Sequence, residues 1–541
     1  MKSGIGWLEA AREQGSAFAM IFTALFLAHA PLLRLPYFWD EAGYFIPAAR
    51  DVLLTGSLIP HTTLSNAHPP LMMVWLAFWW RFSAFTPAVT RTSMLLVAAF
   101  ALLGLWRLAR RVANPPVAIA TVVCTASYPV FFAQSTLAHL DLMSCALTLW
   151  GLALYLERRP IGAIVFFSLA PLAKETAIIT PLALVAWEAA RFFLDGLTVA
   201  GKPLYAAPRS RWQTLSLLFP LLPLGLWFLY HRYVTGYFFG NPEYLRYNLS
   251  ATLSPVRIVL AFLMRLWHLS GYLNLFVLTL AMVYAMSRPA LVEADGSPRN
   301  RIAIDQQAVL YVVILAHVAA FSLLGGAVLA RYLLPVLPLV ILVCVSTLRR
   351  RMRRWKSWMA LTTAVFLVTL AAPPLYRVAP EDTLLYRDYV ILHKEAAEEL
   401  SRRYPQARIL TAWPASDELT RPFLAYVHPP LSVVRIENFS ASELMKAAPA
   451  IGQYDVVYLF STKWQPAHPL IQELPFGRML QEHFFDYHED VSPQEAANLL
   501  NGRIVHYLNR HNEWVAIISI DQIENAALHP PLLLDCTVPV H

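Results

Sequence analysis

Long apolar segments recur along most of this chain, and they restrict its fold more than any other feature. A helix needs roughly 17–25 apolar residues to cross a bilayer, and about eleven segments meet that length. Hydrophobic residues make up 57% of the sequence and charged residues only 14%, whereas about a quarter of the residues of a soluble protein are charged. The sequence therefore predicts a polytopic α-helical membrane protein. The expected spans lie near 16–33, 88–106, 117–134, 139–156, 161–178, 179–194, 213–233, 257–286, 308–328, 331–348 and 357–375.

Arginine-rich runs indicate which ends of these spans face the cytoplasm. They occur at 107–111 (RLARR), 157–159 (ERR) and 349–356 (RRRMRRWK), and short loops rich in lysine and arginine stay on the cytoplasmic side. The net charge of +8 is concentrated in such runs, so we expect no nucleic-acid partner.

The stretch 69–83 decides the topology. It begins PPLMMVWLAFWW, and its shortness, its tryptophans and its two opening prolines are typical of an interfacial helix. If it does not cross and the N-terminus is cytoplasmic, every arginine run is cytoplasmic; if it crosses, every run moves outside. The N-terminal apolar run could also be a signal peptide ending in AHA (28–30), but we favour an uncleaved first span.

The composition changes after about residue 376. The stretches ARILTAWP, LSVVRI, YDVVYLF and EWVAIISI resemble strands, and helical patterns lie between them. We therefore predict a transmembrane domain over 1–376, with a first outer loop over 34–87, and a soluble, extracytoplasmic α/β domain over 377–541. The expected location is the inner membrane of a bacterium, with a cytoplasmic N-terminus and a periplasmic C-terminal domain.

With this topology, ionisable residues gather at the outer ends of the spans. Charged groups at membrane depth are costly and tend to mark function, so acids and bases that converge on one face predict an extracytoplasmic reaction centre. The residues concerned are Asp40, Glu41 and His68 in the first outer loop, His139 and Asp141 in HLDLM, Lys174 and Glu175 in LAKE, and Arg331 and Tyr332 in RYLLPVLP.

Each of these residues also has a purely structural explanation. Asp40 precedes an amphipathic stripe and could only cap a juxtamembrane helix. Arg331 could be a snorkelling anchor, and Lys174 and Glu175 could form a structural ion pair. His68 stands before two prolines and could be a turn residue. The reaction-centre hypothesis rests on their conjunction.

The motifs resemble those of one family. An Asp-Glu pair in the first outer loop, an amphipathic helix, HPPL (68–71) and an aromatic-rich interfacial helix are similar to the GT-C superfamily of polyprenyl-phosphate-sugar-dependent glycosyltransferases. The likeness covers about 16–375 and is to the branch of the protein O-mannosyltransferases and the lipid A aminoarabinose transferase. The latter carry lysine where this chain has His68, and the chain lacks the MIR insertion of eukaryotic mannosyltransferases. The acceptor, whether glycan, lipid or protein, therefore stays open.

The resemblance implies a membrane enzyme that takes its sugar from a polyprenyl-phosphate donor. A polyprenyl phosphate leaves as a stable anion, so such an enzyme needs a base for the acceptor hydroxyl and cations for the phosphate, in a single displacement that inverts the anomeric carbon. We assign Asp40 and Glu41 to catalysis with Asp40 as the base, His68, Lys174 and Arg331 to the donor phosphate, and Asp141, Glu175 and Tyr332 to acceptor binding and orientation. Whether a divalent metal takes part is left open.

Three other functions remain alternatives. A transporter or flippase for a polyprenyl lipid or a sugar would place its charges near the bilayer midplane and show internal repeats. A membrane scaffold for the outer domain would leave the acids and bases unexplained. A ligase or polymerase would differ in its donor, a lipid-diphosphate-linked oligosaccharide.

Overall fold

The computed structural model describes residues 2–520 except 195–197, 200–201, 204–208, 243–244, 247–251, 294, 373, 451, 467–474, 486 and 488. It divides into two compact units. The membrane unit comprises Met1–Arg34, Tyr44–Pro374 and Glu381–Leu384, and the C-terminal unit comprises Leu35–Gly43, Leu375–Pro380 and Leu385–His541. The predicted domain boundary at 376 stays a prediction, and the sequence pattern does not indicate that 35–43 groups with the C-terminal unit.

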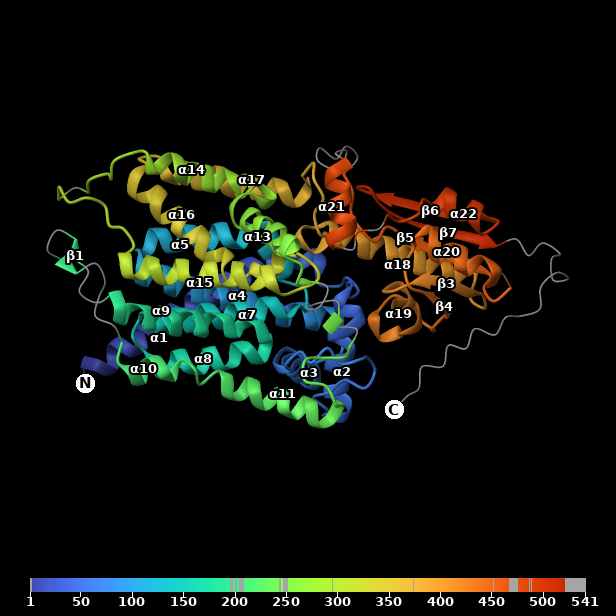
Figure 1. Cartoon of the computed structure of the whole chain (residues 1–541), viewed down its shortest axis with the longest axis horizontal. Coiled ribbons are helices and arrows are strands. Elements are labelled where there is room, and N and C mark those ends of the chain that lie inside the picture. Colours follow the sequence, from blue (N-terminus) through green and yellow to red (C-terminus); the bar gives the residue numbers. More distant parts are fainter. Residues whose placement is uncertain are drawn as a thin grey trace. The chain divides into compact units, whose positions relative to one another are not determined.

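The membrane unit is built from helices, several of which run alongside one another in Figure 1. Their bounds are α1 (Lys2–His29), α2 (Ile46–Thr55), α3 (Leu71–Phe82), α4 (Pro87–Val112), α5 (Pro115–Ser127), α6 (Pro129–Gln134), α7 (Leu140–Leu156), α8 (Pro160–Ala173), α9 (Ile179–Leu194), α10 (Arg211–Ser216), α11 (Leu221–Thr235), α13 (Pro255–Ser270), α14 (Phe276–Met286), α15 (Ile304–Leu323), α16 (Leu337–Arg351) and α17 (Trp355–Ala371). Among the described residues, five helical segments are long and apolar enough to cross a membrane: Arg12–Leu32, Pro87–Val112, Arg211–Thr235, Pro255–Asn274 and Ile304–Leu323. This confirms the predicted membrane fold class.

Several expected spans are broken, and two of these breaks have a clear local cause. The expected span 117–134 ends as α5 and restarts as α6 at Pro129, which has no N–H to donate and forces an extended conformation on Tyr128. The expected span 257–286 is two helices, α13 and α14, joined by the turn Tyr272–Asn274, in which Leu273 has a positive φ of 49°. Reading 257–286 as one helix was wrong.

The C-terminal unit is a five-stranded sheet with helices, which confirms the predicted α/β fold. Its strand order is β4-β3-β5-β7-β6, where β3 pairs in parallel with β4 and β5, and β7 pairs antiparallel with β5 and β6. Four strands coincide with the strand-like stretches, while β6 was missed. The bounds are α18 (Leu385–Arg403), β3 (Arg408–Ala412), α19 (Ala415–Thr420), β4 (Ser432–Ile436), α20 (Ala441–Ala447), β5 (Val456–Phe460), α21 (Pro475–Phe485), α22 (Pro493–Leu499), β6 (Gly502–Arg510) and β7 (Glu513–Ile520). A separate two-stranded sheet lies in the membrane unit and consists of β1 (Thr198–Val199) and β2 (Lys202–Pro203).

Candidate functional site

A buried salt bridge between Asp141 and Lys174 lies at the centre of the candidate site. Asp141 is in the first turn of α7, and Lys174 ends α8, the helix packed against α7. The Lys174 ammonium donates to Asp141 Oδ1 over 2.6 Å, and their side chains are 10% and 5% exposed. The close packing of two successive helices thus brings together an acid and a base that lie in different motifs of the sequence.

Arg331 joins this pair from the short 3-10 helix Ala330–Leu333. Its Nε lies 3.8 Å from Asp141 Oδ2, and its Nη1 lies 3.5 Å from Glu381 Oε1. The same Nη1 lies 2.8 Å from His139 Nδ1 and 3.1 Å from His139 Nε2, and His139 Nδ1 lies 2.8 Å from Gln134 Oε1. These contacts hold a buried guanidinium in a defined orientation.

His68 and Glu175 form a second pair in the same unit. His68 Nδ1 lies 3.1 Å from Glu175 Oε2. Glu175 therefore pairs with His68, and its chain neighbour Lys174 pairs with Asp141, so the simple Lys174–Glu175 ion pair is not what forms.

Three cations surround the ring of Tyr332, and one of them was missed by the sequence analysis. The Lys174 ammonium lies 4.0 Å from the ring centroid, and the guanidinium carbons of Arg265 and Arg331 lie 5.5 and 5.8 Å from it. Arg265 is on α13, is fully buried and donates to the carbonyl of Leu329 over 2.5 Å. We call Lys174, Arg265 and Arg331 the cation cluster.

The signal for Arg265 was present in the sequence as a helical stripe. Arg257, Ala261, Arg265 and His268 all lie on the buried face of α13, at the i, i+4, i+8 and i+11 positions. Residues such as Val259 and Leu263 are exposed instead. The helix therefore turns its polar face inward, an arrangement that a purely hydropathic search treats as an ordinary span.

Two acidic residues that follow α17 in the chain were also missed. Glu381 contacts Arg331, as described above, and its carbonyl accepts from Gln134 Nε2 over 3.0 Å. Asp382 accepts from the Tyr272 hydroxyl over 2.8 Å. Burial, reinforced by the charge of Glu381, raises the pKa of Asp382 to about 8, which favours the protonated carboxyl at neutral pH. Both residues lie in a short 3-10 helix, Pro380–Asp382, and its sequence carries no local sign that it is buried.

Asp40 and Glu41 belong to the segment 35–43, which is part of the C-terminal unit. Glu41 is fully buried, and its Oε2 accepts from the backbone N–H of Phe38 over 2.8 Å. Asp40 is partly exposed and stands directly before a π-helix, Glu41–Phe45. Single-turn π-helices are rare and frequently occur at functional sites.

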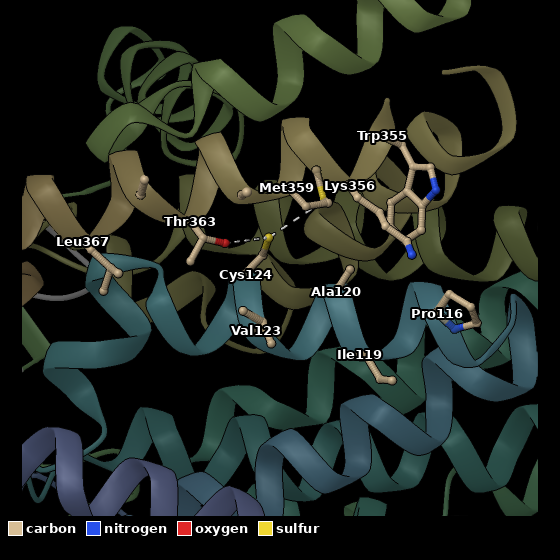
Figure 2. A pocket seen from close by; sticks show the side chains of 12 residues that line it. Pro116, Ile119, Ala120, Val123, Cys124, Trp355, Lys356, Met359, Thr363 and Leu367 are labelled. Atoms are coloured by element: carbon tan, nitrogen blue, oxygen red, sulfur yellow. Dashed lines mark hydrogen bonds between the residues drawn. The ribbon is translucent and has the colours of Figure 1, made fainter. Parts of the chain in front are cut away.

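A separate cavity lies away from these charges. It has a volume of about 730 Å3, lies between α5 and α17, and is lined mainly by apolar side chains with Cys124, Met359 and Thr363 among them (Figure 2). None of the predicted site residues lines it. Among the described residues, no group of three or more histidine, cysteine or acidic side chains is arranged to hold a metal ion.

Residues 67–195 match a family model described as dolichyl-phosphate-mannose-protein mannosyltransferase. That range contains His68, Asp141, Lys174 and Glu175. No curated protein matches the chain.

The fold is similar to that of several solved structures. ArnT from Cupriavidus metallidurans, solved bound to undecaprenyl phosphate, aligns with a TM-score of 0.52 at 14% identity, over 97% of this chain and 99% of that one. The same protein in the apo state gives 0.49 at 13% identity, over 94% and 98%. The oligosaccharyltransferase AglB from Archaeoglobus fulgidus gives 0.48 at 12% identity, over 96% and 75%. The fold shared with ArnT and the family-model match confirm the predicted resemblance to the GT-C glycosyltransferase superfamily, and the chain is an integral membrane protein of GT-C fold.

Proposed function

We propose that the chain is a glycosyltransferase that moves a sugar from a polyprenyl-phosphate donor to an acceptor hydroxyl on the extracytoplasmic face. The observation that carries this proposal is the cation cluster around Tyr332. Lys174 and Arg331 contact the carboxylates Asp141 and Glu381, and Arg265 packs against the same Tyr332 ring, while the raised pKa of Asp382, about 8, favours its uncharged form. An excess of buried positive charge favours binding of an anion.

A lipid phosphate fits this charge. Arginine binds phosphate through two parallel N–H groups and lysine as a point charge, and cations placed at the departing phosphate stabilise the charge that develops there. The family model names a dolichyl-phosphate sugar, and the ArnT structure holds undecaprenyl phosphate. Both names point to the same class of donor. We assign the donor phosphate to Lys174, Arg265 and Arg331, with His68 beside them.

Asp40 is the proposed base. It removes the proton of the acceptor hydroxyl as the acceptor oxygen attacks the anomeric carbon, and the bond from that carbon to the phosphate oxygen breaks. Polyprenyl phosphate leaves with the bonding electrons, and the anomeric carbon is inverted. Glu41 binds a backbone N–H within its own turn, so its part is to hold the turn that carries Asp40.

The remaining assignments follow from the contacts. Asp141 holds Lys174, Glu175 holds His68, and Tyr332 is the ring against which the cations pack. These contacts support orienting roles for the three residues, with the acceptor left as a hydroxyl on a glycan, lipid or protein. We further propose a bacterial inner membrane as the location, and the arginine-rich runs favour a cytoplasmic N-terminus and a periplasmic C-terminal unit.

The test is to incubate the purified full chain with a panel of polyprenyl-monophosphate sugars and candidate acceptors, and to follow release of polyprenyl phosphate by mass spectrometry. We expect release from at least one donor. A matched control is Arg81→Ala, which removes an exposed arginine and leaves release unchanged. Folded protein that binds a donor but releases no polyprenyl phosphate contradicts the proposal and favours a flippase.

A further inference from the structure

The segment that carries Asp40 is built into the C-terminal unit, although residues 44–374 separate the two in the sequence. Tyr37, Phe38 and Ala42 are buried there, each at most 1% exposed. The segment is therefore part of that unit's core.

Aromatic side chains of the C-terminal unit pack against the aromatic side chains of this segment. The ring of Phe38 lies 5.2 Å from that of Tyr389 in an edge-to-face arrangement. The ring of Trp39 lies 5.6 Å from Tyr389 and 5.3 Å from Trp413, also edge to face. Such pairs add stability beyond the apolar area that they bury, and their angles fix the orientation of the rings.

Backbone contacts hold the same segment on both sides of Asp40. Before it, the Tyr426 hydroxyl donates to the carbonyl of Tyr37 over 2.9 Å. After it, the backbone of Gly43 lies against Trp413 so closely that a Cβ atom would stand 2.5 Å from the indole ring. Only glycine permits that approach without displacement of the ring.

The backbone next to Asp40 is strained. Trp39 has a φ of 41°, which is an outlier for a bulky residue, and a π-helix follows directly. Such conformations persist only where the surrounding structure determines them. The surrounding structure here is the C-terminal unit.

Trp413 lies at the edge of the sheet where its parallel strands end. Trp413 directly follows β3, whose neighbours β4 and β5 run parallel to it. Open α/β sheets bind their ligands beyond the carboxyl ends of such strands. In this chain the segment 35–43 packs against that position. The ring of Tyr389 also stacks on the ring of His393, with 3.8 Å between their centroids. His393 Nδ1 in turn lies 2.6 Å from Glu418 Oε2.

We propose that the C-terminal unit is a positioning device for Asp40, in which Trp413, Tyr389 and Tyr426 are positioning residues. The proposal rests on the function proposed above. It gives the sheet the task of fixing the base, while donor phosphate binding belongs to the membrane unit. Loss of a positioning residue should therefore lower kcat and leave the donor KM unchanged, since a misplacement of about 1 Å costs about 10²-fold in rate.

The experiment compares Trp413→Ala with Trp413→Phe in the full chain. We expect Trp413→Ala to lower kcat by about 10-fold or more and to accelerate amide hydrogen exchange over 35–43 by a similar factor. Trp413→Phe keeps an edge-to-face ring and should restore most of both. Tyr426→Phe removes one hydroxyl and should produce a smaller change in the same direction. The control is Trp464→Ala, a buried tryptophan of the same unit that bonds to His511.

The outcomes separate the two proposals. If exchange over 35–43 stays at the wild-type rate in Trp413→Ala, the positioning role is overturned. Equal losses in Trp464→Ala and Trp413→Ala also overturn it, since the effect is then general destabilisation. If exchange accelerates but Asp40→Asn turns over normally, the positioning contacts stand and the assignment of Asp40 as base fails.

Discussion

At the scale of single residues, the buried Asp141–Lys174 salt bridge makes the stability of the protein sensitive to the loss of either partner. Removing one partner of a buried salt bridge leaves a charge without compensation, which costs about 3–5 kcal/mol, whereas removing both costs less. We expect Lys174→Ala to lower the thermal stability of the purified protein clearly, and Asp141→Ala/Lys174→Ala to be more stable than the single variant. If the loss of thermal stability in the double variant equals the sum of the losses in Asp141→Ala and Lys174→Ala, the pairing is contradicted.

Asp382 gives the cluster a defined pH dependence. Its folded-state pKa, about 8, exceeds its ordinary value of 3.8 because of burial and Glu381. Between these two pH values only the folded state keeps the proton. The contribution of Asp382 to the free energy of unfolding is therefore complete below about pH 4 and decreases as the pH rises to about 8. Asp382→Asn, which resembles the protonated acid, should gain stability relative to wild type as pH rises from 5 to 8. Parallel melting curves across that range would refute the assignment.

The sequence revealed some site residues because of where they lie. Asp141, Lys174 and Arg331 interrupt or border apolar runs, where a charge is costly and therefore conspicuous. Glu381 and Asp382 lie in a three-residue 3-10 helix that follows α17, and so short a segment shows no periodicity that would reveal its burial. Which acid pairs with which base depended on helix packing, so the sequence could not assign Lys174 to Asp141 or Glu175 to His68.

At the scale of elements, α13 is the clearest departure from the sequence prediction. Hydropathy merged it with α14, since the average over 257–286 is apolar. Periodicity separates its polar stripe from its exposed apolar face. The turn Tyr272–Asn274 rests on a positive φ at two non-glycine residues, a conformation that residue type does not predict.

The polar face of α13 yields a test of donor binding. Arg265→Ala removes one of the three cations and should weaken binding of polyprenyl phosphate, measured by calorimetry, by about 10-fold, equivalent to about 1.4 kcal/mol for one charge-assisted contact. Arg265→Lys should recover part of the affinity. The control, Arg81→Ala, should bind as wild type does. Unchanged affinity in Arg265→Ala would remove α13 from the phosphate site.

At the scale of the whole molecule, the topology depends on α3. A helix of its length is about 18 Å long, shorter than the roughly 30 Å hydrocarbon core, and its tryptophans and two opening prolines favour an interfacial position over a crossing one. Cysteines introduced at Leu64 and Arg111 in a Cys536→Ser background should then react with impermeant reagents from opposite sides of the membrane. Labelling of both cysteines from the same side would contradict this topology.

The sequence predicted the membrane fold, the C-terminal sheet and most of the charged residues, because each leaves a local pattern. It could not predict that 35–43 packs with the C-terminal unit. That grouping depends on contacts of Phe38 and Trp39 with Tyr389 and Trp413, and no local periodicity reports contacts between segments so distant in the chain.

The central claim is that Asp40 is the base of a transfer from a lipid-phosphate donor. The most direct measurement compares turnover and donor affinity of wild type and Asp40→Asn on a donor that the wild type uses. General-base catalysis contributes about 10²–10⁴-fold, so we predict a loss of turnover of about 10²-fold or more with donor affinity and folding unchanged. Turnover near that of the wild type in Asp40→Asn would contradict the account.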